Sequence, residues 1–430
     1  MASGPLLFLG KGVSNLSIEK IFLVLGFKHK KDFFFFSKVP GETDFENLET
    51  ALSVSKATTL IVSPGFPLAN PLIINFRKVP GNLITSELNI ASLVLDQESC
   101  IGITGSLGKS TTTALLGAAL QVSDPDIFVG GNLGTPLGEY AFEILFENRK
   151  PAKWVVLELS SFQLENCENL KLAQAGLTYL SANHLERYES LAHYYDTKFE
   201  ILNLLGPEGF LHVNAFGGDA ASEISRRKVK NAILADPQDP QIEKYLPEKP
   251  KLLGVHNRQN MAVVVSVLKK LRAPEECLVQ LSSFPGLEHR MEFVGEKNGI
   301  QWINDSKATA LDSVECAIQG ALVGLGPKSK LWVLLGGRDK KHPWRELKKF
   351  ATHSKIHVLC FGEARKLIQN EIGMDHGSDF AKLTLALDWV AAQAKSGDRV
   401  LLSPGGTSLD EFKNFNERGR VFKEFFKNLK

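Results

Sequence analysis

The stretch CIGITGSLGKSTTTALLGAAL, residues 100–120, decides the fold of this chain. Residues 100–104 form an apolar run, residues 105–108 a glycine-bearing turn, and residues 111–120 a run that favours a helix. A buried strand that feeds a glycine loop and then a helix directs backbone N–H groups and the helix N-terminus to one point. We therefore predict a phosphate-binding loop at the start of a domain.

The side chains after this turn suit a nucleotide triphosphate. Lys109 supplies a cation for the β- and γ-phosphates, and the hydroxyl of Ser110 or Thr111 can complete a magnesium coordination shell. Ile103 stands where the usual Walker spacing has its first glycine. The alternative is a glycine turn with a solvated lysine, but the strand before it and the helix after it favour the phosphate loop.

Length and composition indicate an ordinary globular protein with more than one domain. At 430 residues the chain exceeds what one hydrophobic core serves, and we expect three domains. Fifty basic and 48 acidic side chains give a net charge of +2 without a long basic run, which argues against nucleic acid as a partner. Five scattered cysteines without metal-ligand spacing predict neither a disulfide framework nor a zinc site, and they fit a reducing cytoplasm.

Short apolar runs that end at glycine alternate with helical patterns along the whole chain, which predicts an α/β fold. We expect a Rossmann-like domain over residues 1–94, a central P-loop-type ATPase domain with a mostly parallel sheet over 95–285, and a Rossmann-like domain over 286–430. The predicted strands are 6–9, 33–36, 59–62, 100–104, 154–157, 177–180, 209–213, 232–234, 301–303, 331–335, 356–360 and 400–402. The predicted helices include 18–26, 111–120 and 257–271.

The sequence predicts no membrane insertion. No apolar stretch reaches the roughly 18 residues that span a bilayer, and the first residues lack the pattern of a signal peptide. The run Phe33 to Phe36 could contact a membrane, but flanking lysines favour a buried strand.

Several motifs in one order resemble the Mur ligase family. The loop at 104–110 has the shortened form Thr-Gly-x-x-Gly-Lys-Ser, which is typical of Mur ligases and folylpolyglutamate synthases. Further matching motifs lie at 131–134, 158–164, 254–260, 289–292, 304–309, 335–337 and 402–405. The runs Glu-Leu-Ser-Ser-Phe-Gln from 158 and Asn-Asp-Ser-Lys-Ala-Thr from 304 are similar to the D-glutamate-adding branch in particular.

This resemblance implies a reaction and its participants. It implies an ATP-dependent amide-bond-forming ligase that joins D-glutamate to UDP-N-acetylmuramoyl-L-alanine through an acyl phosphate, with Mg²⁺, in cytoplasmic peptidoglycan precursor synthesis. We expect a monomer. One alternative is another Mur ligase, or a folylpolyglutamate synthase-like ligase, with a different acceptor. A more distant alternative is a P-loop regulator without ligase chemistry.

The resemblance also implies roles for individual residues. The catalytic set is Lys109, Glu158, His184, Lys198 and Lys307. The metal set is Ser110, Glu158, His184 and Lys198, with Lys198 as a carbamylated lysine. The nucleotide set is Gly105, Gly108, Lys109, Ser110, Thr111, His256, Asn257, Asn260, Arg290 and Asp305. The substrate set is Gly10, Gly12, Ser14, Ser63, Asn132, Ser160, Thr309, Lys340, Ser408 and Phe415.

Some of these residues have simpler alternative interpretations. Glu158 and Lys198 could be ordinary solvated side chains, Asn257 a helix N-cap, and Lys340 part of a charged turn. The sequence also departs from the family pattern, since Leu107 replaces an asparagine, Asn183 an acidic residue and Ala310 an asparagine.

Overall fold

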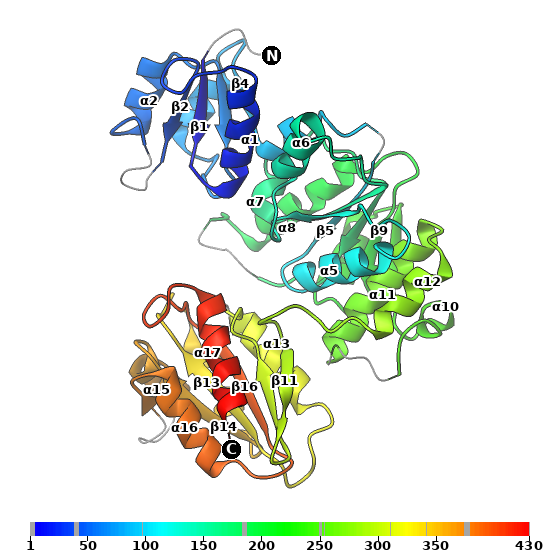
Figure 1. The fold of residues 1–430 in the computed structure, drawn as a ribbon, viewed down its shortest axis with the longest axis vertical. Helices are drawn as coiled ribbons and strands as arrows, with labels where there is room; N and C mark the ends of the chain where they lie inside the picture. Colours follow the sequence, from blue (N-terminus) through cyan, green and yellow to red (C-terminus); the bar gives the residue numbers. More distant parts are fainter. Residues whose placement is uncertain are drawn as a thin grey trace. The chain divides into compact units, whose positions relative to one another are not determined.

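The structure is a computed structural model that contains three sheets in two compact units. It describes residues 5–37, 43–96, 98–182, 187–248, 252, 254–309, 311–340, 342–373 and 379–429. The first unit comprises Met1–Leu246 and Gln259–Leu281, and the second comprises Pro247–Arg258 and Ser282–Lys430. Figure 1 traces the alternation of strands and helices through both units. The α/β class is confirmed.

The first sheet has four parallel strands in the order β2-β1-β3-β4. Its elements are β1 (Leu6–Leu9), α1 (Val13–Val24), β2 (Phe33–Phe36), α2 (Leu48–Ser55), β3 (Thr59–Val62), α3 (Pro71–Arg77), β4 (Leu83–Thr85) and α4 (Glu87–Ala91). The phenylalanine run is strand β2, and the ring of Phe35 stacks on that of Phe8 with centroids 4.9 Å apart. Three of the four β2 side chains are buried, so the predicted buried strand is confirmed.

The second sheet has six parallel strands in the order β10-β9-β8-β5-β7-β6. Its elements up to the last strand are β5 (Ser99–Thr104), α5 (Lys109–Leu120), β6 (Phe128–Gly131), α6 (Leu137–Phe146), β7 (Trp154–Glu158), α7 (Ser161–Leu164), β8 (Gln174–Leu177), α8 (Leu191–Phe199), η1 (Glu200–Leu204), β9 (Leu211–Asn214), α9 (Ala220–Arg227) and β10 (Ala232–Ala235). The elements that follow are α10 (Pro240–Glu243), α11 (Val255–Lys270), α12 (Glu275–Val279) and η2 (Gln280–Ser282). Strand β5, which carries the glycine loop, lies inside the sheet between β8 and β7.

The strand predicted at 177–180 was placed too late. The strand is β8, Gln174–Leu177. It begins with a polar residue, Gln174, which is buried and whose side-chain oxygen lies 3.0 Å from His212 Nε2. This hydrogen-bond partner allows a polar side chain inside the sheet. The apolar tail after Leu177 leaves the sheet, since Thr178 donates from Oγ1 to the carbonyl oxygen of Leu107. A tertiary partner at each end of the segment therefore overrode its apolar pattern.

The first two sheets share one hydrophobic core within the first unit. Helix α6 packs against both α1 and α4, and buried Phe8 and Leu137 belong to the same cluster. The carboxylate of Glu87 in α4 accepts a 2.6 Å hydrogen bond from the Gly138 backbone N–H at the start of α6. Packing and a helix-terminal hydrogen bond thus fix the first sheet to the second.

The third sheet lies in the second unit and has the strand order β11-β12-β16-β13-β14-β15. Strand β11 pairs antiparallel with β12, and the other strands are parallel. The elements are β11 (Glu292–Lys297), β12 (Ile300–Asn304), α13 (Leu311–Leu322), β13 (Leu331–Gly336), η3 (Trp344–Leu347), α14 (Lys348–Ala351), β14 (Ile356–Phe361), α15 (Arg365–Ile372), β15 (Asp379–Phe380), α16 (Leu383–Gln393), β16 (Arg399–Gly405) and α17 (Phe415–Asn428).

Helices cover both faces of this third sheet. One buried cluster joins its strands to α13, η3, α14 and α15, and another joins them to α16 and α17. Figure 1 shows α17 lying over one face of this sheet. No helix in the described parts of the chain is both long enough and apolar enough to cross a bilayer.

Candidate functional site

The phosphate loop adopts the conformation that its glycines predict. Strand β5 ends at Thr104 and α5 begins at Lys109. Gly105 and Gly108 have φ values of +146° and +85°, which a residue with a Cβ rarely adopts. Gly108 is the N-cap of α5 and no side chain caps this helix, so its first backbone N–H groups face the loop. This arrangement suits an anion.

The loop is held from the other side by the residues that follow β8. Besides the Thr178 bond to Leu107, the backbone N–H of Ser106 donates to the carbonyl oxygen of Tyr179 at 2.6 Å. The Ser106 hydroxyl donates to the carbonyl of Ser181 at 2.9 Å and lies 3.0 Å from the hydroxyl of Tyr194. The loop is therefore preorganised, and neither Ser106 nor Tyr194 was among the predicted site residues.

Two lysines converge on the loop. Lys109 Nζ and Lys198 Nζ both donate to the carbonyl oxygen of Gly105 at 2.8 Å. Lys198 is buried, and burial lowers the pKa of its amine well below the usual range. The charge of Lys109 lowers that pKa further, while Glu158 opposes the shift. The solvated alternative for Lys198 is therefore wrong, because its amine is buried and bonded to the Gly105 carbonyl.

Glu158 completes this cluster from the end of β7. The side chain is buried, and its Oε1 accepts a 2.5 Å hydrogen bond from Asn132 Nδ2. Its Oε2 is buried and accepts no hydrogen bond from the residues that the structure describes. A buried carboxylate oxygen without a donor is costly unless a cation binds it. Magnesium prefers such hard oxygen ligands, so the residues present fit a divalent cation.

Other predicted nucleotide residues lie around the same loop. Ser110 in the first turn of α5 is buried, and Thr111 is half-buried. Asn260 in α11 lies against Gly108, because a Cβ added to this glycine would come within 2.8 Å of Asn260 Oδ1. His184 lies outside the described residues.

Ser160 has a local structural partner. It is the N-cap of α7, where Gln163 and Ser160 form a reciprocal capping box with the Gln163 backbone N–H 3.3 Å from Ser160 Oγ. The spacing Ser-x-x-Gln is the signal that could have predicted this role from sequence. Its hydroxyl thus caps the start of α7, the helix that follows Glu158.

A second cluster of predicted residues lies at the carboxyl ends of the two inner strands of the first sheet, β1 and β3. Gly10 has a φ of +89° and faces Ser63, whose hydroxyl occupies the space that a Gly10 side chain would need. Gly12 is the N-cap of α1, has no capping side chain, and has open space beside it. Half-buried Ser14 lies in the first turn of α1. In the order β2-β1-β3-β4, this point between β1 and β3 is where the strand order reverses, which is where open α/β sheets bind ligands.

In the second unit, Asp305 follows β12 and is buried. Its Oδ2 accepts from Ser403 Oγ at 2.9 Å, and its Oδ1 accepts from the Met291 backbone N–H at 3.1 Å. Burial raises the pKa of this carboxyl to about 7. Arg290 lies between His289 and Met291, which have φ values of +64° and +44°. This strained turn brings the predicted Arg290 loop beside Asp305.

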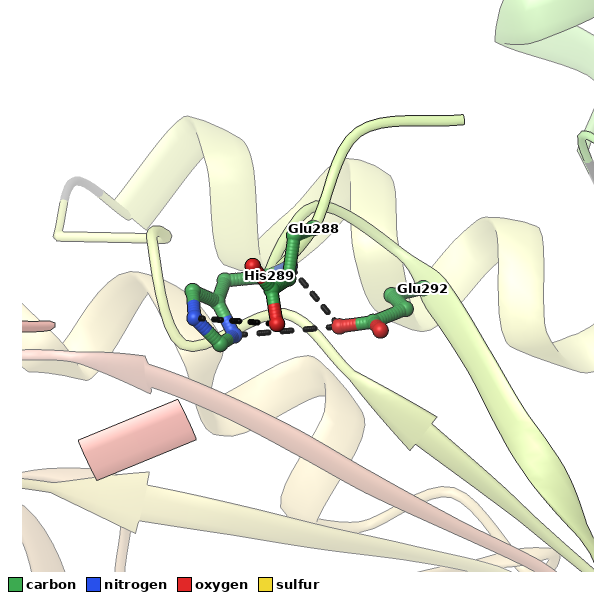
Figure 2. Close-up of side chains that lie close together, drawn as sticks. All are labelled: Glu288, His289 and Glu292. Atoms are coloured by element: carbon green, nitrogen blue, oxygen red, sulfur yellow. Dashed lines mark hydrogen bonds and ion pairs between the residues drawn. The ribbon is translucent and has the colours of Figure 1, made fainter. Parts of the chain in front are cut away.

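Figure 2 shows three side chains around this turn that lie close together and whose ligand atoms lie within 4.8 Å of one another, so their chemistry would suit a metal. They are Glu288, His289 and Glu292. However, Lys423 Nζ donates to both glutamates at 2.7 and 2.6 Å, and Asn304 Nδ2 lies 2.8 Å from His289 Nδ1. The two glutamates thus accept hydrogen bonds from Lys423, and the His289 ring is paired with the Asn304 amide. These contacts give the cluster a structural role, which is to fix the turn that carries Arg290.

His256 and Asn257 lie in the first turn of α11, which begins at Val255. Burial lowers the pKa of His256 to about 4, so its ring is neutral near pH 7. The ring packs against Gly320, where an added Cβ would come within 3.0 Å of it. Asn257 is buried two residues after the helix start. Its alternative interpretation as a helix N-cap is therefore wrong.

The predicted acceptor residues gather at the carboxyl ends of neighbouring strands β12, β16 and β13. Lys307 Nζ lies 3.8 Å from the centre of the Phe415 ring. Thr309 presents its carbonyl oxygen to His342 Nε2 at 3.1 Å. Ser408 is buried after β16, and Lys340 is exposed after β13.

Arg418, which the sequence did not predict, connects these loops. The side chain is fully buried in α17, and it donates to the carbonyl oxygens of Ser306 at 2.8 Å and Gly406 at 3.2 Å. Burial lowers the pKa of its guanidinium to about 10, so it remains charged. The signal that could have found it is an arginine within the apolar stripe formed by Phe415 and Phe422.

The phosphate loop, the parallel sheets and the buried carboxylate beside two lysines define a nucleotide-binding α/β protein of the phosphate-loop class. The family model described as Mur ligase middle domain matches residues 103–268, and that described as Mur ligase, glutamate ligase domain matches residues 289–406. The chain belongs to the Mur ligase family, among the UDP-N-acetylmuramoylalanine--D-glutamate ligases.

Individual relatives support this placement. The UDP-N-acetylmuramoylalanine--D-glutamate ligase of Anaeromyxobacter dehalogenans is 33% identical over 400 residues, which cover 87% of this chain and 84% of that protein. The enzyme of the same name from Myxococcus xanthus is 33% identical over 397 residues, which cover 86% and 84%. The solved structure of MurF ligase from Thermotoga maritima in complex with ADP shares the fold, with a TM-score of 0.60 and 15% identity over 88% of this chain and 91% of that one.

Proposed function

We propose that this chain catalyses the ATP-dependent ligation of D-glutamate to UDP-N-acetylmuramoyl-L-alanine in cytoplasmic peptidoglycan precursor synthesis. Its relatives carry the name of that reaction, and the chain covers most of their length. The observation that carries the proposal is the convergence of Lys109 and Lys198 on the Gly105 carbonyl beside buried Glu158. That cluster is suited to hold and polarise a triphosphate.

The chemistry needs an activated carboxylate, because a free carboxylate is a poor acyl donor. The γ-phosphoryl group of ATP moves to the alanine carboxylate of the donor and gives an acyl phosphate. The amine of D-glutamate then attacks the acyl carbon, inorganic phosphate leaves, and an amide forms. Lys109 neutralises the charge that develops on the transferred group, as phosphoryl transfer requires.

Magnesium would be held by Glu158, His184, the Ser110 hydroxyl and Lys198 in its carbamylated form. When bound, it neutralises charge on the nucleotide phosphates. The amine of Lys198, whose pKa is lowered by burial, is neutral for a larger share of time than a solvated lysine. A neutral amine can add carbon dioxide and become a carbamate, and we propose that Lys198 is modified in this way.

The other ligands divide between the remaining sites. We propose that the nucleotide contacts include Gly105, Gly108, Thr111, His256, Asn257, Asn260, Arg290 and Asp305. For the UDP-linked donor we propose Gly10, Gly12, Ser14, Ser63, Asn132 and Ser160. For D-glutamate we propose Lys307, Thr309, Lys340, Ser408 and Phe415, because cations and hydroxyls suit a substrate with two carboxylates. We further propose domains at 1–94, 95–285 and 286–430, and a monomer.

The test is phosphate release from ATP in the presence of UDP-N-acetylmuramoyl-L-alanine, with D-glutamate, L-glutamate, L-alanine and L-lysine offered in turn. D-glutamate alone should support turnover, and product mass should rise by one glutamyl residue. Turnover with another acceptor would instead identify a different branch of the family. Lys109→Ala should abolish turnover, because it removes the cation that faces the transferred phosphoryl group. Near-normal ligation by this variant would contradict the assigned mechanism.

A further inference from the structure

Arg187 connects two parts of the first unit, the loop that follows β3 and the end of α7. Its guanidinium donates to the carbonyl oxygen of Gly65 at 3.3 Å and to that of Phe66 at 3.2 Å. These carbonyls lie in the loop that follows β3 and begins with Ser63. The same guanidinium therefore holds the loop through two backbone acceptors.

The other side of Arg187 is anchored to the end of α7. Its Nε and terminal N–H groups donate to the two carboxylate oxygens of Glu165 at 3.0 and 2.6 Å. Its guanidinium carbon lies 4.2 Å from the centre of the Phe162 ring. A guanidinium that pairs with a carboxylate and stacks on an aromatic ring has a defined orientation, which a lysine ammonium lacks. The side chains of Arg187 and Glu165 are only 14% and 15% exposed, which limits screening by solvent.

The loop that Arg187 holds forms one wall of the candidate donor site. Ser63 faces Gly10, and Gly10 leads into the uncapped N-terminus of α1. The same loop and the α7 region line one pocket, whose lining includes Ser63, Phe66, Gln163 and Arg187. A shift of the Gly65 carbonyl would therefore move Ser63 relative to Gly10 and change the shape of the donor site.

We propose that Arg187 is a positioning residue for the UDP-linked donor, and that it acts through the backbone of Gly65 and Phe66. The inference rests on the proposed function, which assigns the Ser63 loop to this donor. Arg187 has no assigned contact with ATP or D-glutamate. Its loss should thus weaken donor binding selectively, because the loop loses two charge-assisted hydrogen bonds that preorganise it.

The test compares Arg187→Ala, Arg187→Lys and Glu165→Gln with wild-type protein in steady-state phosphate release. KM is measured for each of the three substrates, and donor binding is measured separately by calorimetry without ATP. Arg226→Ala is the matched control, because Arg226 makes the same two-point pair with a glutamate, Glu223, but does so at 59% exposure and without loop contacts.

Arg187→Ala should raise the donor KM and the donor Kd by about tenfold, while kcat and the other two KM values stay within about twofold. Arg187→Lys should recover part of the loss, because lysine keeps the ion pair but lacks the fork that reaches both carbonyls. Glu165→Gln should change donor KM in the same direction by a smaller factor. Arg226→Ala should behave as wild type.

Equal changes in all three KM values, or a lowered melting temperature with unchanged donor KM, would show a purely structural role and overturn the proposal. Unchanged donor binding in all three variants would do the same. Failure of the proposed function is seen separately, because the wild-type protein would then show no D-glutamate-dependent phosphate release with this donor.

Discussion

Replacing Glu87 with glutamine tests how the first sheet is fastened to the second. The Glu87 carboxyl is buried at the N-terminus of α6, where it accepts the 2.6 Å bond from Gly138. Burial raises its pKa from the ordinary value of 4.5 to about 7, against the effect of the two backbone N–H groups of Gly138 and Leu137. Glutamine keeps the acceptor and the shape but cannot ionise.

The direction of the pH effect follows from proton binding. Between pH 4.5 and about 7 the folded state holds a proton on Glu87 that the unfolded chain has lost. The stabilising contribution of the protonated group is therefore complete below pH 4.5 and is lost as pH rises through about 7. At roughly 1.4 kcal/mol per pKa unit, the shift corresponds to about 3 kcal/mol.

Urea-induced unfolding at pH 5 and pH 8, followed by circular dichroism and by amide exchange of the α6 peptides, measures this contribution. Glu87→Gln should gain up to about 3 kcal/mol relative to wild type between pH 5 and pH 8. Glu223→Gln is a control without pH dependence in this range, because hydrogen bonds from Arg226 and Arg227 lower the pKa of Glu223 below its ordinary value of 4.5, so the group is ionised in both the folded and the unfolded state. If the wild-type and Glu87→Gln stabilities run parallel across this range, the reasoning is wrong.

Three further predictions concern the second unit. Burial raises the pKa of Asp305 to about 7, so this carboxyl passes from mostly protonated to mostly ionised between about pH 6 and 8. Because the ionised carboxylate is the better hydrogen-bond acceptor for the nucleotide, wild-type KM for ATP should fall over this range, whereas Asp305→Asn should show a flat profile in the same assay. Arg418→Met should lower the free energy of unfolding by about 3 kcal/mol or more, measured by urea denaturation and tryptophan fluorescence, because the Ser306 and Gly406 carbonyls lose their buried donor; an unchanged midpoint would refute this role. Phe415→Ala should raise the KM for D-glutamate severalfold, because Lys307 loses the ring that orients its ammonium group, and an equal rise in the KM for ATP would count against that assignment.

Local sequence was enough to predict the phosphate loop and most strands. The order of strand, glycine turn and helix around residues 100–120 depends on short-range backbone preferences, and the structure places β5 and α5 there. The phenylalanine run was likewise predicted as a buried strand from its composition and flanking charges. The error at β8 arose where a buried polar residue, Gln174, has a partner far along the chain.

The sequence by itself determined the α/β alternation, the anion-binding turn and the family whose motifs the chain carries, because each depends on residues that are neighbours in the chain. Only the tertiary structure placed Lys198 on the same carbonyl as Lys109, turned the Asn132 amide toward Glu158, and brought Arg187 to the Gly65 carbonyl. Such contacts join residues from different strands and loops. Their energies depend on burial and distance in space, which no local pattern of side chains encodes.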